Sequence, residues 1–286
     1  MAHTSSLLNL GCGDRYHPSW INIDFVARRN AVVGHNLHSG IPFEDEKFDV
    51  VYHSHLLEHF PKSSALFFLR ECYRVTKCEG TIRVVVPDLE RIARVYLEAL
   101  GKAAQGDDEW EANYEWIKLE LYDQVVRERP GGEMAAYLSQ ECIPNRKFVL
   151  GRVGVEGERI AEQVAQSRNN TGSKTPQLAA LRRLFGGFHC LFRNQSVARE
   201  WAIRRILGSE YELLELGRFR RGGEIHLWMY DRYSLARLLE EAGFASPTLV
   251  SPTESRIPNW ANYHLDTEPD GVVYKPDSLY MEAVKQ

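Results

Sequence analysis

The chain has 286 residues, of which 44% are hydrophobic and 26% are charged; these fractions are ordinary for folded proteins and exclude a disordered or fibrous chain. The formal net charge is −4, so the chain lacks the basic character of most nucleic-acid-binding proteins. No apolar run reaches the roughly 20 residues that a membrane span needs, and no basic segment precedes an apolar stretch at the N-terminus, so we expect a cytoplasmic protein.

Short apolar segments and one helical pattern alternate along the first part of the chain. Ser63–Thr76 carries apolar residues at helical spacing, and we expect this helix to end at Lys77–Gly80, with Gly80 in the left-handed conformation. Strands joined by crossovers predict a parallel sheet with helices on both faces. The expected strands are Leu7–Leu10, Ile21–Phe25, Ala31–Val33, Phe48–Tyr52 and Thr81–Val86.

The connection between the first two strands is short. It has ten residues, Gly11 to Trp20, and Pro18 is one of them. A crossover that contains a helix needs at least about 10–12 residues. The helix in this connection must therefore be very short or absent.

The strand patterns stop at about residue 98 and return at about residue 225. We expect residues 1–98 and 225–286 to form one sheet domain, with residues 99–224 as a mostly helical insertion that caps the substrate. The segments expected in and after the insertion are a helix around Trp110–Val125, a polar loop at Gln166–Pro176, helices at Leu178–Leu184, Val197–Leu207 and Asp231–Gly243, and strands at Ser246–Val250 and Leu279–Val284.

Glycine or polar residues follow each of the first five predicted strands. In an open α/β sheet, ligands bind beyond the carboxyl ends of the strands, so these residues are the first candidates for a binding site. The five groups are Gly11-Cys12-Gly13, Asp24, Asn36-Leu37, His53-Ser54-His55 and Pro87-Asp88.

The glycine motif favours a ligand without phosphates. A dinucleotide-binding motif would place a third glycine at position 16, which is Tyr16, and no Gly-Lys-Ser/Thr of a P-loop follows. The short connection also leaves little helix whose N-terminus could hold a pyrophosphate. Asp24, at the end of the second strand, can accept hydrogen bonds from two ribose hydroxyls. S-adenosylmethionine, which has an adenosine and a sulfonium but no phosphate, fits these features.

Several stretches of the sequence resemble known enzymes. LNLGCG at residues 8–13 and WINIDF at residues 20–25 resemble the class I S-adenosylmethionine-dependent methyltransferases, and residues 41–60 resemble their type 11-like members. Residues 226–244 and 275–285 resemble a narrower bacterial group associated with surface glycan biosynthesis. The resemblance leaves out the insertion, and it implies a Rossmann-like sheet of seven strands with an antiparallel last strand.

The resemblance also implies roles for the residues at the sheet edge. Asn9 stands where the family has an acid, so this position cannot neutralise the ammonium group of the cofactor. The cofactor-binding residues that the resemblance implies are Gly11, Cys12 and Gly13 around the methionine and ribose, Asp24 on the ribose hydroxyls, Asn36 and Leu37 beside the adenine, and His53 and His55 bordering the methyl donor.

A hydroxyl acceptor needs a base to take its proton, whereas an amine acceptor needs only to be neutral. His226, where the insertion rejoins the sheet domain, is the first candidate for a catalytic base, and Asp88 is the second. The alternatives are a structural histidine and an N-cap, respectively. His55 and His59 are weaker candidates, and Glu58 suits the first turn of a helix.

The five cysteines lie far apart, and no Cys-x-x-Cys or Cys/His zinc pattern is present. We therefore expect free thiols and no metal site.

We predict an S-adenosylmethionine-dependent methyltransferase that acts on a small molecule or a glycan or nucleotide-sugar acceptor, with O-methylation favoured over N-methylation. Nine arginines against four glutamates in residues 182–221 indicate either solvated helix faces or an anionic acceptor. The alternatives are a non-catalytic cofactor-binding module or partner subunit, an NAD or nucleotide-sugar enzyme on a related fold, and an RNA methyltransferase. The sequence leaves the oligomeric state open.

Overall fold

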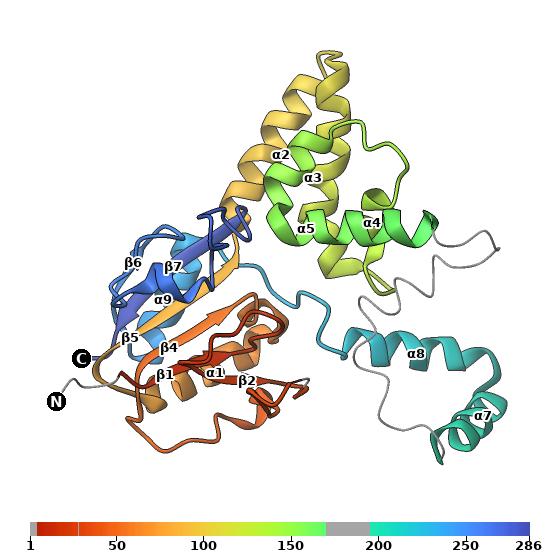
Figure 1. The fold of residues 1–286 in the computed structure, drawn as a ribbon. Coiled ribbons are helices and arrows are strands. Elements are labelled where there is room, and N and C mark those ends of the chain that lie inside the picture. Colours follow the sequence, from red (N-terminus) through yellow and green to blue (C-terminus); the bar gives the residue numbers. More distant parts are fainter. Residues whose placement is uncertain (1–4, 28, 170–194) are drawn as a thin grey trace. The chain divides into compact units, whose positions relative to one another are not determined.

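The structure is a computed structural model, in which residues 5–27, 29–169 and 195–286 are described (Figure 1). The chain divides into two compact units. The sheet unit comprises Met1–Arg94 and Leu227–Gln286, and the helical unit comprises Val95–His226. Within the described ranges, no helix has the length and apolar character needed to cross a membrane.

The sheet unit has seven strands in the order β3-β2-β1-β4-β5-β7-β6. The first five strands in sequence run parallel, and β7 is antiparallel to both β5 and β6. This arrangement confirms the Rossmann-like α/β sheet and its antiparallel last strand. The strands are β1 (Leu7–Leu10), β2 (Ile21–Asp24), β3 (Val32–Gly34), β4 (Phe48–Ser54), β5 (Thr76–Pro87), β6 (Ala245–Leu249) and β7 (Ser278–Val284).

Two helices cover one face of this sheet, α1 (Lys62–Val75) and α9 (Arg232–Ala242). Their buried apolar residues, among them Phe68 and Leu235, join one core cluster with the strands. Asp231 begins α9 with a capping box, and Gly243 ends it in the left-handed conformation with φ 111°. Both ends of α9 therefore match the expectation from the sequence.

Loops rather than helices cover the opposite face, so the expectation of helices on both faces is wrong among the described residues. The connection from β6 to β7, which contains the 3-10 helix η4 (Trp260–Tyr263), packs there on Trp20, Tyr52 and Tyr280. The connections from β1 to β2 and from β2 to β3 are too short to supply helices for this face.

Two buried asparagines hold the helix-free connection from β1 to β2. Asn9 and Asn22 are paired across the two strands, and Asn9 Nδ2 donates to Asn22 Oδ1 and to Arg15 O, both at 3.0 Å. Asn22 Nδ2 donates to His17 O at 3.0 Å and to Trp20 O at 2.8 Å. These bonds satisfy carbonyls of the connection that a helix would otherwise pair.

The expected helix Ser63–Thr76 is confirmed to within one residue, but the expected role of Gly80 at its end is wrong. The helix ends at Val75, with Thr76 as its C-cap, and β5 already begins at Thr76. Gly80 lies inside β5, where a Cβ would come within 2.8 Å of Lys77 O and 3.0 Å of Asp49 O. The glycine is therefore needed for close backbone approach and not for a left-handed helix end.

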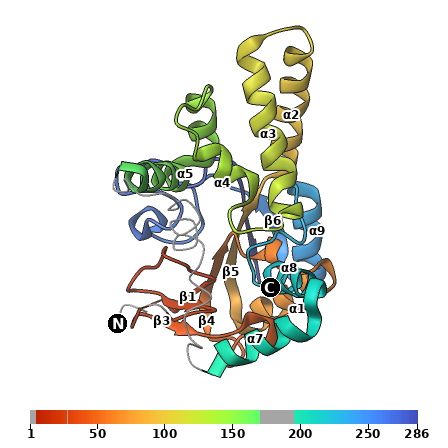
Figure 2. The ribbon, with the colours of Figure 1, turned by 90° about the vertical axis from the view of Figure 1, so that its right-hand side faces the viewer.

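The helical unit contains the expected helix around Trp110–Val125, which is α3 (Asp108–Val126), and Trp116 is fully buried in its core. Helices α2 and α3 lie side by side (Figure 2), and the rings of Tyr96 and Tyr114 approach to 5.9 Å between them. The polar loop is expected to start at Gln166, but helix α5 (Arg146–Asn169) continues through the first four of its residues. The rest of the expected loop and the expected helix at Leu178–Leu184 lie outside the described residues. The elements are α2 (Leu89–Ala103), which starts in the sheet unit, α3 (Asp108–Val126), α4 (Gly132–Leu138), α5 (Arg146–Asn169), α7 (Gln195–Leu207), η3 (Gly208–Glu210) and α8 (Tyr211–Arg220).

Candidate active site

The loop after β1 has the backbone that its glycines suggest. Gly11 and Gly13 have φ angles of 64° and 52°, in the left-handed region that other residues rarely adopt. A Cβ on Gly11 would lie 2.8 Å from Leu56 Cδ1, whereas a Cβ on Gly13 would have no atom within 4 Å. The loop is therefore packed against the segment after β4 at Gly11 and faces open space at Gly13.

Asp24 lies beside this loop at the end of β2. The Gly13 N–H donates to Asp24 Oδ2 at 2.9 Å, and the Val26 N–H donates to Oδ1 at 3.2 Å. Each carboxylate oxygen accepts more than one hydrogen bond, so the half-buried side chain keeps capacity for ribose hydroxyls. The arrangement suits the predicted ribose contact, which stays a prediction.

The Cys12 side chain points away from solvent and is 6% exposed. Burial, together with the charge of Asp24, raises the pKa of the Cys12 thiol to about 12. The thiol is therefore protonated at neutral pH and does not act as a nucleophile. A contact between Cys12 and the cofactor would involve its backbone.

Asn36 and Leu37 follow β3, as predicted, but their side chains differ in position. Asn36 is exposed, and its Oδ1 accepts a hydrogen bond from the His38 N–H at 3.1 Å at the start of η1 (Leu37–Ser39). Leu37 packs into the core of the sheet unit. Of the two predicted adenine neighbours, only Asn36 presents its side chain at the surface.

His53 is fully buried on the α1 side of the sheet, where its ring lies 5.3 Å from that of Phe68. Burial lowers the pKa of His53 to about 3, so the ring is neutral in the folded protein at ordinary pH. His53 is therefore a core histidine, and its predicted contact with the cofactor remains a prediction.

His53 should make the protein sensitive to acid. Between pH 6.5 and about 3 the unfolded chain binds a proton at His53 that the folded chain does not bind, so stability falls as the pH falls, by at most about 1.4 kcal/mol per pH unit. We expect His53→Leu to reduce this slope in urea unfolding compared at about pH 7 and about pH 5. Equal slopes in the two proteins would contradict the burial of a neutral imidazole.

His55 is the first residue after β4, and it lies between a hydroxyl and a carboxylate. Its Nε2 is 2.8 Å from Ser278 Oγ, and its Nδ1 is 3.3 Å from Glu58 Oε1. Ser278 is 223 residues away along the chain, so no local pattern in the sequence could pair the two. Sequence reasoning missed Ser278 for this reason.

Asp88 caps the start of α2, which is the structural role given above as the alternative to a catalytic base. Its Oδ1 accepts a hydrogen bond from the Arg91 N–H at 3.1 Å, and its own N–H donates to Asp277 O at 3.1 Å. A short parallel bridge joins Asp88 to Tyr230. The role of Asp88 as a base therefore remains a prediction for a carboxylate that already has a structural function.

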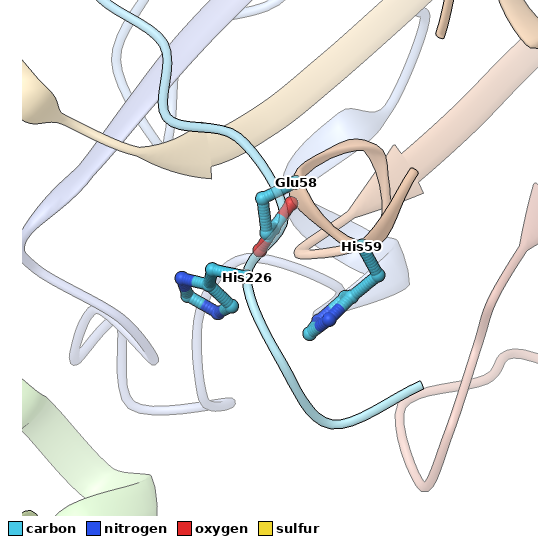
Figure 3. Close-up of side chains that lie close together, drawn as sticks. All are labelled: Glu58, His59 and His226. Atoms are coloured by element: carbon cyan, nitrogen blue, oxygen red, sulfur yellow. The ribbon is translucent and has the colours of Figure 1, made fainter. Parts of the chain in front are cut away.

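His226 is the last residue of the helical unit and is 3% exposed. Its N–H donates to Gln124 O at 3.0 Å, and the next N–H in the chain, that of Leu227, donates to Glu58 O at 2.7 Å. Figure 3 draws the side chains of Glu58, His59 and His226. The role of His226 as a base remains a prediction.

Comparison with known proteins gives one family match. A methyltransferase-domain model matches residues 8–84, and no curated protein matches the chain. Among solved structures, the YcgJ protein from Bacillus subtilis is 18% identical, with a TM-score of 0.25 over 34% of this chain and 51% of that one. The chain thus spans about half the length of YcgJ.

Two further structures align over nearly the whole chain. A possible histamine N-methyltransferase from Thermotoga maritima is 11% identical, with a TM-score of 0.37 over 99% of this chain and 83% of that one. An S-adenosylmethionine-dependent methyltransferase from Mesorhizobium loti is 13% identical, with a TM-score of 0.37 over 99% and 91%. These scores are too low to support an argument.

The family match and the sheet point to the same part of the chain. The matched residues include the glycine loop, Asp24 and the end of β4, and they lie at the carboxyl edge of a seven-stranded sheet whose last strand is antiparallel, as the resemblance implies. Residues 8–84 of the sheet unit are accordingly similar to a methyltransferase domain.

Proposed function

We propose that the whole protein transfers a methyl group from S-adenosylmethionine to a hydroxyl of a small-molecule or glycan-type acceptor. The observation that carries the proposal is the Asp24 carboxylate beside a left-handed glycine loop at the carboxyl edge of the sheet. Asp24 would hold the ribose, and the open space at Gly13 would admit the rest of the cofactor.

The bound cofactor supplies the methyl group and the sulfur leaving group, so the protein mainly aligns the acceptor and handles a proton. O-methylation is supported by the groups that can take a proton beyond β4 and β5, which are His55, Glu58 and Asp88. An amine acceptor would need no such group. The resemblance of the C-terminal segments to a group associated with surface glycan biosynthesis supports a glycan-type acceptor.

An anionic acceptor is part of the proposal. The described part of the arginine-rich stretch includes Arg218, Arg220 and Arg221 at the end of α8. Arg218 pairs with Glu200, and Arg220 donates to Val125 O at 3.3 Å, whereas Arg221 is exposed. A phosphorylated acceptor would complement these cations.

Thermal shift tests the cofactor. At a concentration about 100 times its Kd, S-adenosylhomocysteine should stabilise the protein by about 2.7 kcal/mol, which raises the Tm by roughly 5–10 °C. NAD at the same concentration serves as the control and should leave the Tm unchanged, because the glycine loop lacks the dinucleotide pattern. A shift with NAD alone would contradict the proposal.

Transfer of a tritiated methyl group tests the acceptor. The panel contains methyl glucoside, glucose 6-phosphate, UDP-glucose and glucosamine, which separate hydroxyl, phosphorylated, nucleotide-linked and amine acceptors. We expect transfer to oxygen, located by mass spectrometry of the product. Transfer confined to the amine of glucosamine would overturn the preference for oxygen.

A further inference from the structure

We propose, on the basis of the function proposed above, that His55 is the base for methyl transfer to a hydroxyl, with Ser278 passing the proton to it and Glu58 orienting its ring. All three residues belong to the sheet unit. The inference assigns the base to the end of β4 rather than to His226 or Asp88.

The contacts of His55 give each ring nitrogen a separate partner. Nε2 lies 2.8 Å from Ser278 Oγ, at hydrogen-bonding distance, and Nδ1 lies 3.3 Å from Glu58 Oε1. Glu58 is fully buried and Ser278 is 7% exposed, whereas the His55 side chain is 14% exposed. A histidine held between a hydroxyl and a buried carboxylate is the arrangement that activates hydroxyls in many enzymes.

This group adjoins the predicted cofactor loop. His53 in β4 pairs with Leu10 in β1, so the next residue of each segment, Ser54 and Gly11, lies at the same edge of the sheet. Leu56 packs directly against Gly11. His55 therefore lies in the segment directly after β4, which borders the loop where the methyl donor is expected.

The backbone at His55 is held in a conformation that costs free energy. Its φ is 49°, in the left-handed region that residues other than glycine rarely adopt. Its N–H donates to Val85 O at 2.9 Å, which extends the pairing of β4 and β5 and fixes the residue. Strain of this kind is characteristic of sites where a side chain must be placed accurately.

The charges around Glu58 determine whether it can orient His55. Burial raises the pKa of Glu58, while the neighbouring His59 and Lys275 lower it. Glu58 in turn contributes to the raised pKa of the buried Tyr230. As a carboxylate, Glu58 favours a proton on the Nδ1 of His55, which lies 3.3 Å from Glu58 Oε1, and so leaves the Nε2 lone pair for the Ser278 hydroxyl.

Methyl transfer to the acceptor oxygen releases one proton, which ends on His55. The acceptor oxygen forms a bond to the methyl carbon, and the bond from that carbon to sulfur breaks with its electron pair passing to sulfur. The acceptor hydroxyl gives its proton to Ser278 Oγ, and Ser278 gives its own to His55 Nε2. The products are a methyl ether, a neutral thioether and an imidazolium paired with the Glu58 carboxylate.

The tautomer of His55 tests this arrangement without any acceptor. Long-range proton–nitrogen NMR spectra of protein labelled with nitrogen-15 in histidine, assigned with His55→Gln, distinguish a proton on Nδ1 from one on Nε2. We expect the proton on Nδ1. A proton on Nε2, which a protonated Glu58 would impose by donating to Nδ1, would overturn the inference.

Kinetics with the hydroxyl acceptor from the panel test the function of the residues. We expect His55→Gln to lower kcat by about 100-fold or more, with KM changed by no more than about threefold. Ser278→Ala should also lower kcat, and Ser278→Thr, which keeps the hydroxyl, should restore it. A kcat for His55→Gln equal to that of the natural protein would overturn the inference.

A second histidine provides a matched control. His264 also has a φ of 49°, so His264→Gln makes the same replacement in the same backbone conformation, and kcat should be unchanged. Titration of each variant with S-adenosylhomocysteine separates the two proposals. If the natural protein fails to bind S-adenosylhomocysteine, the proposed function is contradicted. If it binds S-adenosylhomocysteine but the NMR spectra place the His55 proton on Nε2, only the role of His55 is contradicted.

Discussion

Replacement of Asp24 by alanine is expected to raise the Kd for S-adenosylhomocysteine by about 100-fold or more. Each hydrogen bond to a charged group contributes about 1.5–3 kcal/mol, and two ribose hydroxyls can bond to one carboxylate. A loss of about 3 kcal/mol corresponds to somewhat more than a hundredfold in Kd. Isothermal titration calorimetry on the purified variants measures this change directly.

The same replacement also removes two bonds that shape the loop, those from the Gly13 and Val26 N–H groups. Asp24→Asn separates the two effects, because an amide oxygen can still accept one of these bonds while the negative charge is lost. Asp14→Ala is the matched control, since Asp14 is an exposed carboxylate in the same loop. An unchanged Kd for Asp24→Ala would exclude this residue from ribose binding.

Local patterns in the sequence predicted much of the sheet unit. The strands are short runs of apolar residues, and their order places Asp24 beside the glycine loop because parallel neighbours end at one edge. The ends of α9 follow from Asp231 and Gly243, whose side-chain and backbone preferences act within a few residues. These features depend on residues that are close along the chain, so they can be predicted from the sequence.

Contacts between distant residues could not be predicted in this way. The β6–β7 connection looks polar, yet Trp260 packs against Trp20 and Tyr52 at ring distances of 6.2 and 5.2 Å. Ser278 reaches His55 only because antiparallel β7 begins at the edge where parallel β4 ends. Such pairs become visible only once the order and direction of the strands are fixed.

Arg15 links the cofactor loop to the connection from β6 to β7, residues 250–277, which is called the covering segment below. It directly follows Gly13-Asp14, and its guanidinium lies 3.9 Å from the centre of the Tyr274 ring. Arg15 Nη1 pairs with Glu268 at 3.0 Å, and Nη2 donates to Thr267 O at 3.0 Å. The β6–β7 connection thereby supports the loop from the face that lacks helices.

A fully buried arginine holds the other end of this connection. Arg83 in β5 pairs with Asp266 and Glu282, each at 2.7 Å, and Tyr52 donates to Asp266 Oδ1 at 2.6 Å. Arg83 also donates to Ser251 O at 2.8 Å and lies over the ring of Trp260, 4.4 Å from its centre. The cation thus joins the sheet, both carboxylates and the covering segment.

Replacement of Arg83 by methionine should therefore destabilise the sheet unit strongly. It leaves two buried carboxylates without their cation, and breaking a buried ion pair in this way costs about 3–5 kcal/mol. Urea unfolding should show this loss in free energy, and hydrogen exchange should locate it in β5, β7 and the connection before β7. We expect these amide groups to exchange only when the covering segment opens.

Arg94→Met is the matched control, because the exposed Arg94 pairs at 2.7 Å with Glu90 of the same unit, and Glu90 keeps a second cation, Arg232, at 3.0 Å. An exposed pair of this kind contributes at most about 1 kcal/mol, so the control should unfold nearly as the natural protein does. A similar, small loss in both variants would mean that the buried carboxylates accept protons at little cost. The covering segment would then depend on the aromatic contacts of Trp260 and not on the charge of Arg83.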